Sequence, residues 1–583
     1  MGTRYSSSAF YEYHRQFSLR AASHLRQQPD SKEEKITSPS HSGVSTPIDI
    51  RALETELTNH PDKAFVDHLL SGLVNGFDTG LESLPSNNIV CKNLRSATKD
   101  PSSVTLLLKK EMDKGYLLGP FDSIPFSRYR INPIGLAEHK YSKKKRLIVD
   151  LSAPHQDPDN PSLNSLIDKI MCSLKYVTVD DAIAMIKKCG PDSWLMKTDI
   201  TDAFKLLPIK QDLWPYHGIQ WNGQFFFFTR LVFGSRSSPK LFDGLSQAVV
   251  WIAKNNYGIN NILHLLDDFL VIEPRHVQAT ETMKRFISMF KNLNIPLGAH
   301  KTVGPCTSLE YLGVFLDTVL CESRLPQEKV ERIIEIVDSF KDKKSCTKRE
   351  LLSLLGHMNF ASRCVRPGRS FVSHLISLST SVRELYYRIK ITNACRSDLN
   401  MWSEFLKQWN GTSFFLDDRI TLAADLHLYT DATTDGFGGI LCNKWFQGYF
   451  PIELKIRDIS MALYELYPIV MACVLWGHLW NRKRILFHCD NQATVEIITK
   501  DGQIQEFGAA CRSTPSTVSS CVFSDDELNS AVDGLWNIAI SDKTQSTYKK
   551  NSEKVYLRVC DVIISDDKSW FTLLLRSSKS DPF

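Results

Sequence analysis

Residues 264–272 read HLLDDFLVI, with Asp267 and Asp268 side by side between two apolar runs. The apolar runs predict two short strands, and the Asp pair predicts the tight turn that joins them. Two carboxylates at one hairpin tip repel each other, and one would hold its proton unless a cation lies there. Mg²⁺ suits such a pair because it prefers carboxylate oxygens and keeps positions free for phosphate. This stretch alone leaves an ordinary surface turn open as the alternative.

A second acidic motif lies upstream, where residues 194–204 read WLMKTDITDAF. An apolar strand is expected to end at Asp199, and a turn then leads into Phe204. Two-metal phosphoryl transfer needs carboxylates from separate strands that converge on ions about 4 Å apart. Asp199 at a strand end and Asp267 at a hairpin tip meet that need. Asp202 is a weaker candidate, since it can equally cap the turn.

Together these two motifs resemble the palm of a reverse transcriptase. Asp199 matches the first catalytic aspartate of that family, and Asp267 with Asp268 matches its second acidic motif. The resemblance implies that these three carboxylates are catalytic and hold the metal ions, Mg²⁺ or alternatively Mn²⁺. Leu265 departs from the family, which usually has Tyr or Phe two positions before the Asp pair. Leucine keeps the strand apolar but offers the primer end neither a ring nor a hydroxyl.

Further motifs of the same family surround these in the expected order. Residues 144–152, KKRLIVDLS, resemble the fingers strand, and residues 231–239, LVFGSRSSP, resemble the loop and helix that cradle template and nucleotide. Residues 297–302 and 311–313 resemble the two motifs that follow the Asp pair. Each match alone is weak, but the ordered set is specific. Carried over by position, the resemblance implies substrate binding by Arg146, Phe204, Phe233, Gly234, Ser238, Pro239 and Lys301.

Three of these residues have a physical reason for their role. The planar fork of Arg146, in a run of four cations at 143–146, suits phosphate oxygens. By resemblance, Phe204 stacks under the sugar of the nucleotide, where a ring leaves no room for a 2′-hydroxyl. This favours DNA synthesis over RNA synthesis. Gly234 lets the backbone approach the nucleotide closely.

The composition indicates a soluble, multidomain protein. The chain has 583 residues, 43% of them hydrophobic and 23% charged, with a formal net charge of +5. So small a charge means that nucleic acid must be bound by local patches. The 14 cysteines show no Cys-x-x-Cys spacing, which indicates reduced thiols in cytosol or nucleus and not a secreted protein. No apolar run approaches the roughly 18 residues of a membrane span, so no membrane partner is expected.

A second set of acidic residues lies in the C-terminal half. Residues 426–432 and 484–490 read as strands that contain Asp431 and Asp490, and residues 460–480 read as an apolar helix that carries Glu465. This order resembles ribonuclease H, which implies that the three carboxylates are catalytic and hold two metal ions. After Lys500 that resemblance ends, and the family's fourth acidic residue has no good match among Asp501, Asp525 and Asp526.

The remaining sequence points to a mobile element. A Ser/Thr-rich linker precedes residues whose helical patterning resembles the start of a tyrosine recombinase. Reverse transcriptase, ribonuclease H and recombinase-like sequence in this order resemble DIRS-like retrotransposons, as do residues 59–67, 346–354 and 484–491. The expected fold is an α+β multidomain chain, a right-hand polymerase followed by a truncated ribonuclease H-like α/β domain and a helical C-terminal segment. The expected boundaries are 1–47 disordered tail, 48–115 helical extension, 116–316 fingers and palm, 317–423 thumb and connection, 424–500 truncated ribonuclease H-like domain, 501–525 linker and 526–583 recombinase-like helical fragment.

The function expected from the sequence is therefore RNA-directed DNA synthesis, with RNA and DNA template-primer and deoxynucleoside triphosphates as partners. A degenerate ribonuclease H module accompanies it. The alternative is a decayed or domesticated copy that only binds nucleic acid, which the truncated modules favour and the intact Asp199, Asp267 and Asp268 oppose. An RNA-synthesising polymerase is a third possibility, disfavoured by Phe204. The sequence leaves the oligomeric state open.

Overall fold

The computed structural model describes residues 44–138, 143–155, 157–408, 412–414, 426–450, 460–479, 485–491, 493–494, 518–522, 556–564 and 571–577. The chain divides into two compact units, Met1–Thr307 and Ser308–Phe583. Most of the tail expected to be disordered, residues 1–43, lies outside the described residues. Residues 44–47 correct that prediction, because Thr46 Oγ1 donates to the Leu206 carbonyl at 2.7 Å and Arg230 donates to Ser45 Oγ at 3.0 Å.

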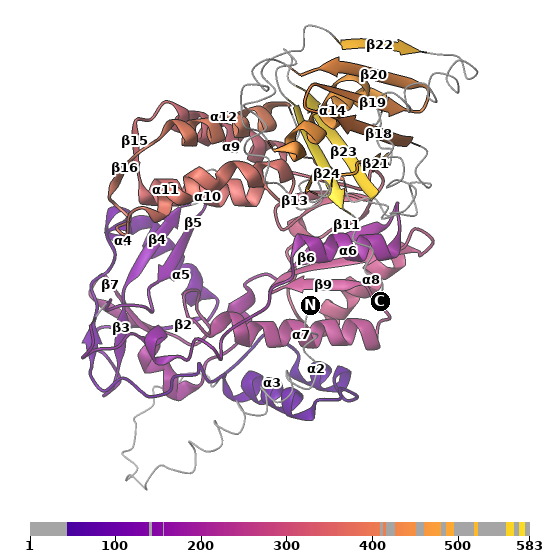
Figure 1. The fold of residues 1–583 in the computed structure, drawn as a ribbon. Helices are drawn as coiled ribbons and strands as arrows, with labels where there is room; N and C mark the ends of the chain where they lie inside the picture. Colours follow the sequence, from indigo (N-terminus) through magenta and orange to yellow (C-terminus); the bar gives the residue numbers. More distant parts are fainter. Residues whose placement is uncertain are drawn as a thin grey trace. The chain divides into compact units, whose positions relative to one another are not determined.

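A four-stranded antiparallel sheet forms the centre of the first unit (Figure 1). Its order is β11 (Val303–Cys306), β6 (Trp194–Asp199), β10 (Asp268–Glu273) and β9 (Ile262–Leu265). Phe269 and Val271 of β10 pack with aromatic residues of the helices α7 (Ser238–Asn255) and α8 (Ala279–Asn292). The other face of β10 contacts α6 (Val179–Cys189). Both faces are thus covered, which explains why β10 reads as a continuous apolar run.

The hairpin at the end of this sheet differs by one residue from the predicted one. The two turn residues are Leu266 and Asp267, because Leu265 pairs with Asp268, the first residue of β10. Leu266 takes up the left-handed conformation with a φ of +53°. The expectation that Asp267 and Asp268 together form the turn is therefore wrong for Asp268. A two-residue hairpin needs a positive φ at its first position, and Leu266 supplies it.

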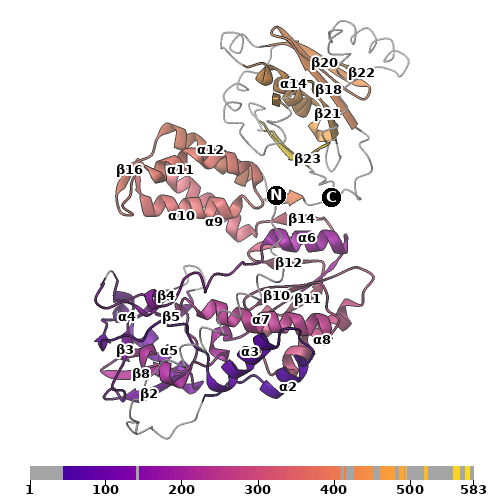
Figure 2. The same ribbon diagram turned by 60° about the horizontal axis from the view of Figure 1, so that its bottom comes forward.

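A second sheet and a hairpin make up the remainder of the first unit (Figure 2). The sheet has five strands in the order β1-β3-β7-β8-β2, and β4 pairs with β5 as a separate antiparallel hairpin. Within the expected helical extension lies α5, with Asp100 as its N-cap. The strands are β1 Ile89–Val90, β2 Leu117–Phe121, β3 Arg130–Asn132, β4 Ile134–Glu138, β5 Lys145–Val149, β7 Gly218–Trp221 and β8 Gln224–Phe228; the helices are α2 Ile50–Glu56, α3 Lys63–Asn75, α4 Arg95–Lys99 and α5 Pro101–Asp113.

The second unit begins with a small sheet and a group of helices. Residues 347–350, TKRE, have the sequence pattern of a helix capping box, and the structure forms it, since the side chains of Thr347 and Glu350 each accept from the backbone N–H of the other residue. Helical structure dominates residues 327–408, as expected. The sheet order is β12-β13-β14-β17, and β15 pairs with β16. The elements are β12 Ser308–Tyr311, β13 Val314–Asp317, β14 Glu322–Arg324, β15 Ser345–Thr347, β16 Arg388–Lys390, β17 Thr412–Phe414, α9 Gln327–Lys341, α10 Lys348–Ala361, α11 Ser373–Thr380 and α12 Asn393–Gln408.

A seven-stranded sheet follows in the order β22-β20-β19-β18-β21-β23-β24, and α14 (Met461–Trp476) packs on it. The central strands are β18 (Leu426–Ala432) and β21 (Ile485–His488), which run parallel. Their partners are β19 Gly436–Leu441, β20 Lys444–Tyr449, β22 Val518–Val522, β23 Tyr556–Ile564 and β24 Phe571–Ser577. No helix among the residues described has the length and apolar character needed to cross a membrane.

The C-terminal strands correct two predictions. β22 lies inside the expected linker, and β23 and β24 lie where a helical fragment was expected. Their sequences, VSSCV, YLRVCDVII and FTLLLRS, are rich in branched and aromatic side chains that favour strands. The helical patterning was therefore overread at residues 556–560, and residues 526–555 lie outside the described part of the chain.

Candidate active site

Three carboxylates converge at one end of the central sheet. Asp199 is the last residue of β6, and it lies directly opposite Asp268 in the β6–β10 ladder. The carbonyl of Asp267, in the turn before β10, accepts a hydrogen bond from the Ile200 N–H at 3.0 Å. The structure thus brings together all three residues that the sequence predicted. Two of them face each other on neighbouring strands, and the third lies in the turn beside them.

Backbone contacts hold this end of the sheet in place. The buried hydroxyl of Ser246, on α7, donates to the Leu266 carbonyl at 2.8 Å and so fixes the turn. On the other side, the Gly298 N–H donates to the Asp199 carbonyl at 2.9 Å. Sequence reasoning did not single out Ser246. Its signal was a small polar residue on the apolar face of a helix, which is a common core feature.

The side chains carry more negative charge than their neighbours neutralise. Lys301 Nζ lies 2.6 Å from Asp199 Oδ2, and Lys197 Nζ lies 3.6 Å from Asp268 Oδ1. Asp267 forms no ion pair within the described residues. Burial, together with the charges of Asp199 and Asp268, raises the pKa of Asp267 to about 6. Burial also raises the pKa of Asp268, although Lys197 opposes that shift.

This donor set fits a divalent cation. Asp199 is 6% exposed, and Asp267 and Asp268 are half-buried, so bulk water screens their repulsion poorly. Three carboxylates face only two lysines. A hard divalent cation would supply the missing positive charge through the oxygen ligands that it prefers. The residues present therefore fit the Mg²⁺ or Mn²⁺ expected from the sequence.

Asp202 does not join this group. It has a φ of +54°, and its carboxylate forms an ion pair with Lys114 and accepts a 3.4 Å hydrogen bond from the Tyr116 hydroxyl. It occupies the N-cap position of η2 (Ala203–Leu206) but makes no side-chain capping bond. Asp202 is therefore neither part of the carboxylate group nor a side-chain cap of the turn, because Lys114 and Tyr116 bind its carboxylate instead.

Phe204 lies on η2, which follows the end of β6 at Asp199. It is 7% exposed, and its ring centroid is 4.7 Å from that of Phe233 and 5.5 Å from that of Phe242. Phe233 is 57% exposed. The two sequence-predicted aromatic residues therefore form one contact pair, with Phe204 anchored in the core by Phe242 and Phe233 at the surface.

The loop at 233–236 is fixed by close packing. Gly234 has a φ of +101°, and a Cβ there would lie 2.5 Å from the Val149 carbonyl oxygen. Asn164, on η1 (Leu163–Leu166), donates to the Gly234 carbonyl at 2.8 Å and accepts from the Arg236 N–H at 2.8 Å. Sequence reasoning missed Asn164, because one buried amide far from the motif leaves no periodic signal.

The remaining predicted substrate residues lie in different surroundings. Ser238 is fully buried and donates its hydroxyl to the Val232 carbonyl at 2.9 Å, so it supports the loop. Pro239 follows in the first turn of α7 and is half-buried. Arg146, on β5, is exposed and forms no ion pair with the described residues, whereas its neighbour Lys145 pairs with Asp100. Of these, Arg146 has its charge available for a phosphate.

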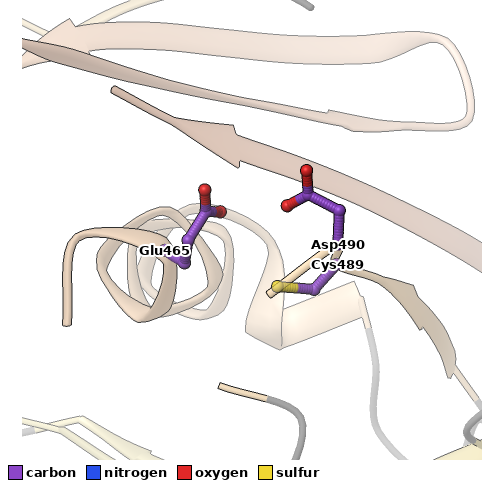
Figure 3. A group of neighbouring side chains, drawn as sticks. All are labelled: Glu465, Cys489 and Asp490. Atoms are coloured by element: carbon purple, nitrogen blue, oxygen red, sulfur yellow. The ribbon is translucent and has the colours of Figure 1, made fainter. Parts of the chain in front are cut away.

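The second set of carboxylates also converges. Asp431 lies near the end of β18. Glu465 projects from α14, and Asp490 follows β21 (Figure 3). Burial, together with the charges of Asp431 and Asp490, raises the pKa of Glu465 to about 8. Burial raises the pKa of Asp431 to about 6, and Asp490 adds to that shift. Ligand atoms of Glu465 and Asp490 lie within 4.8 Å of each other, and Asp431 is near enough to both for their charges to repel.

The first unit has a family match. The model of the family "Reverse transcriptase (RNA-dependent DNA polymerase)" matches residues 122–316, which include Asp199, Asp267 and Asp268. The chain therefore carries an RNA-directed DNA polymerase domain, and the resemblance to reverse transcriptases is confirmed. A search of curated proteins finds no match.

Solved structures similar to the chain include foamy viral protease-reverse transcriptases. The dRH form in complex with double-stranded DNA is 16% identical, with 81% of this chain and 79% of that chain covered and a TM-score of 0.44. Another complex with double-stranded DNA is 16% identical, with 78% and 92% covered and a TM-score of 0.43. A complex with an RNA/DNA hybrid is 13% identical, with 88% and 64% covered and a TM-score of 0.42.

The packing at Gly234 yields a prediction. Gly234→Ala is expected to shift the loop away from Val149, because the new Cβ cannot lie 2.5 Å from a carbonyl oxygen. A displacement of about 1 Å lowers nucleotide incorporation by about a hundredfold. The matched control is Gly223→Ala, which also has a positive φ but no atom within 4 Å of the new Cβ. Primer-extension rates and melting temperatures of both variants check this, and equal rates would refute it.

Proposed function

We propose that this chain synthesises DNA on RNA and DNA templates by two-metal nucleotidyl transfer, with Asp199, Asp267 and Asp268 as the metal ligands. The observation that carries the proposal is the β6–β10 register, which sets Asp199 opposite Asp268 with Asp267 in the adjoining turn. When bound, Mg²⁺ would activate the primer 3′-hydroxyl and neutralise the triphosphate. Mn²⁺ is the alternative ion.

The chain's own residues would position the reactants around these carboxylates. The Ser246 and Gly298 contacts hold the acidic edge rigid, which keeps the ligand positions fixed during the reaction. Arg146 would bind the triphosphate with its free guanidinium, and Lys301, 2.6 Å from Asp199, lies close enough to contribute positive charge there. Gly234 and Pro239 would shape the wall that the template and nucleotide contact.

Phe204 and Phe233 would select the sugar. The contact with Phe242 anchors Phe204, so its ring has little freedom to withdraw from a 2′-hydroxyl. Steric exclusion of this kind favours deoxynucleotides over ribonucleotides.

The first prediction from this proposal concerns metal binding. Asp267→Asn removes one ligand charge and is expected to lower magnesium-dependent primer extension on an RNA template by about a thousandfold, since metal ligation contributes several kcal/mol and about 1.4 kcal/mol corresponds to tenfold. The control is Asp192→Asn, which removes a carboxylate bound to Arg275 at 2.8 Å. Incorporation by Asp267→Asn at the control's rate would show that this turn does not hold the metal.

The second prediction concerns sugar selection. Phe204→Ala is expected to raise ribonucleotide incorporation relative to deoxynucleotide incorporation by about tenfold or more, because a gap replaces the ring. The control is Phe290→Leu, which also shortens a buried aromatic side chain of the first unit, one that packs against Phe269 and Phe286. The ratio of kcat/KM for the two nucleotides cancels any general loss of folded protein. An unchanged ratio in Phe204→Ala rules out this residue as the gate.

For the second unit we propose a degenerate ribonuclease H module built on Asp431, Glu465 and Asp490. The parallel β18–β21 pair with α14 packed on it supports this, as does the repulsion among the three carboxylates. The fourth acidic candidates Asp501, Asp525 and Asp526 lie outside the described residues. In the structure β20 and β21 both have partner strands on their outer sides, because β22 and β23 pair with them.

The cleavage prediction therefore depends on the metal ligands alone. Three carboxylates can gather one ion firmly, but without a fourth the second ion is held weakly. Hydrolysis of an RNA–DNA hybrid by the full chain is expected to be about a hundredfold slower than by a chimera with a complete ribonuclease H C-terminus. Equal rates for both proteins, abolished in each by Asp431→Asn, would show that three carboxylates suffice.

The proposed biological setting is a DIRS-like retrotransposon. The sequence phrases that resemble that family support it, although the recombinase-like helix is not seen in β23 or β24. The second candidate is a decayed or domesticated copy that only binds nucleic acid. Its support is the incomplete carboxylate set in the second unit. Primer extension on an RNA template separates the two candidates, since a binding protein would retain template affinity without incorporating nucleotide.

A further inference from the structure

A thiol belongs to the acidic cluster of the second unit. Donor atoms of Glu465, Cys489 and Asp490 all lie within 4.8 Å of one another. Figure 3 shows Glu465 projecting from α14 toward Asp490, with Cys489 next to Asp490 on the segment after β21. These three donors come from two elements that the apolar core holds together, since Phe487 of β21 and the α14 residues share one buried cluster. The cluster is therefore preassembled by packing.

The burial of Glu465 gives a second, independent indication of a ligand. Glu465 is 3% exposed, and its Oε2 atom finds no hydrogen-bond donor within the described part of the chain. Buried carboxylate oxygens are normally paired with a donor or a cation. The carboxylate of Asp490 lies within 4.8 Å of a Glu465 carboxylate oxygen and cannot stabilise the charge of Glu465. A cation between Glu465 and Asp490 would satisfy both groups.

We propose that Glu465, Cys489 and Asp490 form a binding site for a thiophilic divalent cation, of the class of Zn²⁺ and Co²⁺, in preference to Mg²⁺. A thiolate is a soft ligand that Mg²⁺ does not favour, whereas Zn²⁺ binds sulfur and carboxylate oxygen together. Three protein donors leave a coordination position for water. The thiol proton is released to solvent when the metal binds.

This site shares Glu465 and Asp490 with the proposed ribonuclease H centre, and in that respect it rests on that proposal. The thiophilic site would have the opposite effect on hybrid cleavage, because a bound thiophilic cation occupies the position that Mg²⁺ would need. Zn²⁺ then holds the module in a form that binds metal without cleaving hybrid. The site is distinct from the polymerase carboxylates of the first unit, where Asp199, Asp267 and Asp268 offer oxygen alone.

The test is titration of the full chain with Co²⁺, followed by near-ultraviolet absorption of the sulfur-to-cobalt charge-transfer band. The band is expected in the wild type, and Cys489→Ser is expected to lose it, with a drop of about tenfold or more in Co²⁺ affinity at this site. Cys442→Ser is the matched control, since Cys442 is an exposed thiol of the same sheet and lies outside the cluster. Zn²⁺ is expected to displace Co²⁺ and abolish the band, whereas millimolar Mg²⁺ leaves it in place.

Two outcomes would overturn the proposal. One is a band of equal intensity in the wild type and Cys489→Ser, which would place the cobalt on other thiols. The other is displacement of Co²⁺ by Mg²⁺ at similar concentration. Asp490→Asn provides a second variant that spares the core, because Asp490 is exposed, and it is expected to weaken Co²⁺ binding while retaining the band. Cleavage of hybrid in Mg²⁺ is measured separately, so failure of the nuclease proposal leaves the absorption result unaffected.

Discussion

The pairing of β6 with β10 is the constraint on which the proposed polymerase site depends. It brings Asp199 and Asp268 to opposing positions of an antiparallel ladder, at the end of strands whose other residues are buried. The two negative charges repel each other across the ladder, and partial burial strengthens that repulsion. The ladder, the Ser246 bond to the turn and the Gly298 bond to Asp199 oppose that repulsion with backbone contacts. The fold thus holds in place a charge arrangement that favours cation binding.

The sequence predicted this part of the chain well because its signals are local. The apolar run of β10 and the adjacent aspartates were enough to predict strand and carboxylate positions, and the Thr347–Glu350 capping box predicted the start of α10. What the sequence did not reveal depends on distant contacts. Asn164 serves the Gly234 loop from 70 residues away, and the assignment of Asp268 to a strand instead of a turn depended on a positive φ at Leu266.

The C-terminal strands illustrate the opposite difficulty. Apolar and polar residues alternate only imperfectly along β23, which begins at residue 556. The apolar residues at 555 and 556 therefore fitted a helical pattern as readily as a strand. Branched side chains and a partner strand decide between the two, and the partner, β21, lies about 70 residues earlier in sequence. The residue pattern of a short segment cannot indicate a partner strand so distant in the sequence. The same holds for β22, whose Ser and Thr neighbours are typical of a linker.

The two acidic clusters of the chain balance their charges in different ways. In the first unit, Lys197 and Lys301 lie beside Asp268 and Asp199, so part of the repulsion is neutralised by protein cations. In the second unit no lysine or arginine among the described residues forms an ion pair with Asp431, Glu465 or Asp490, and the pKa of Glu465 rises to about 8 as a result of burial and its acidic neighbours. The two lysines leave less uncompensated negative charge in the first cluster. The second site, with its thiol and its buried oxygen, favours an ion that stays.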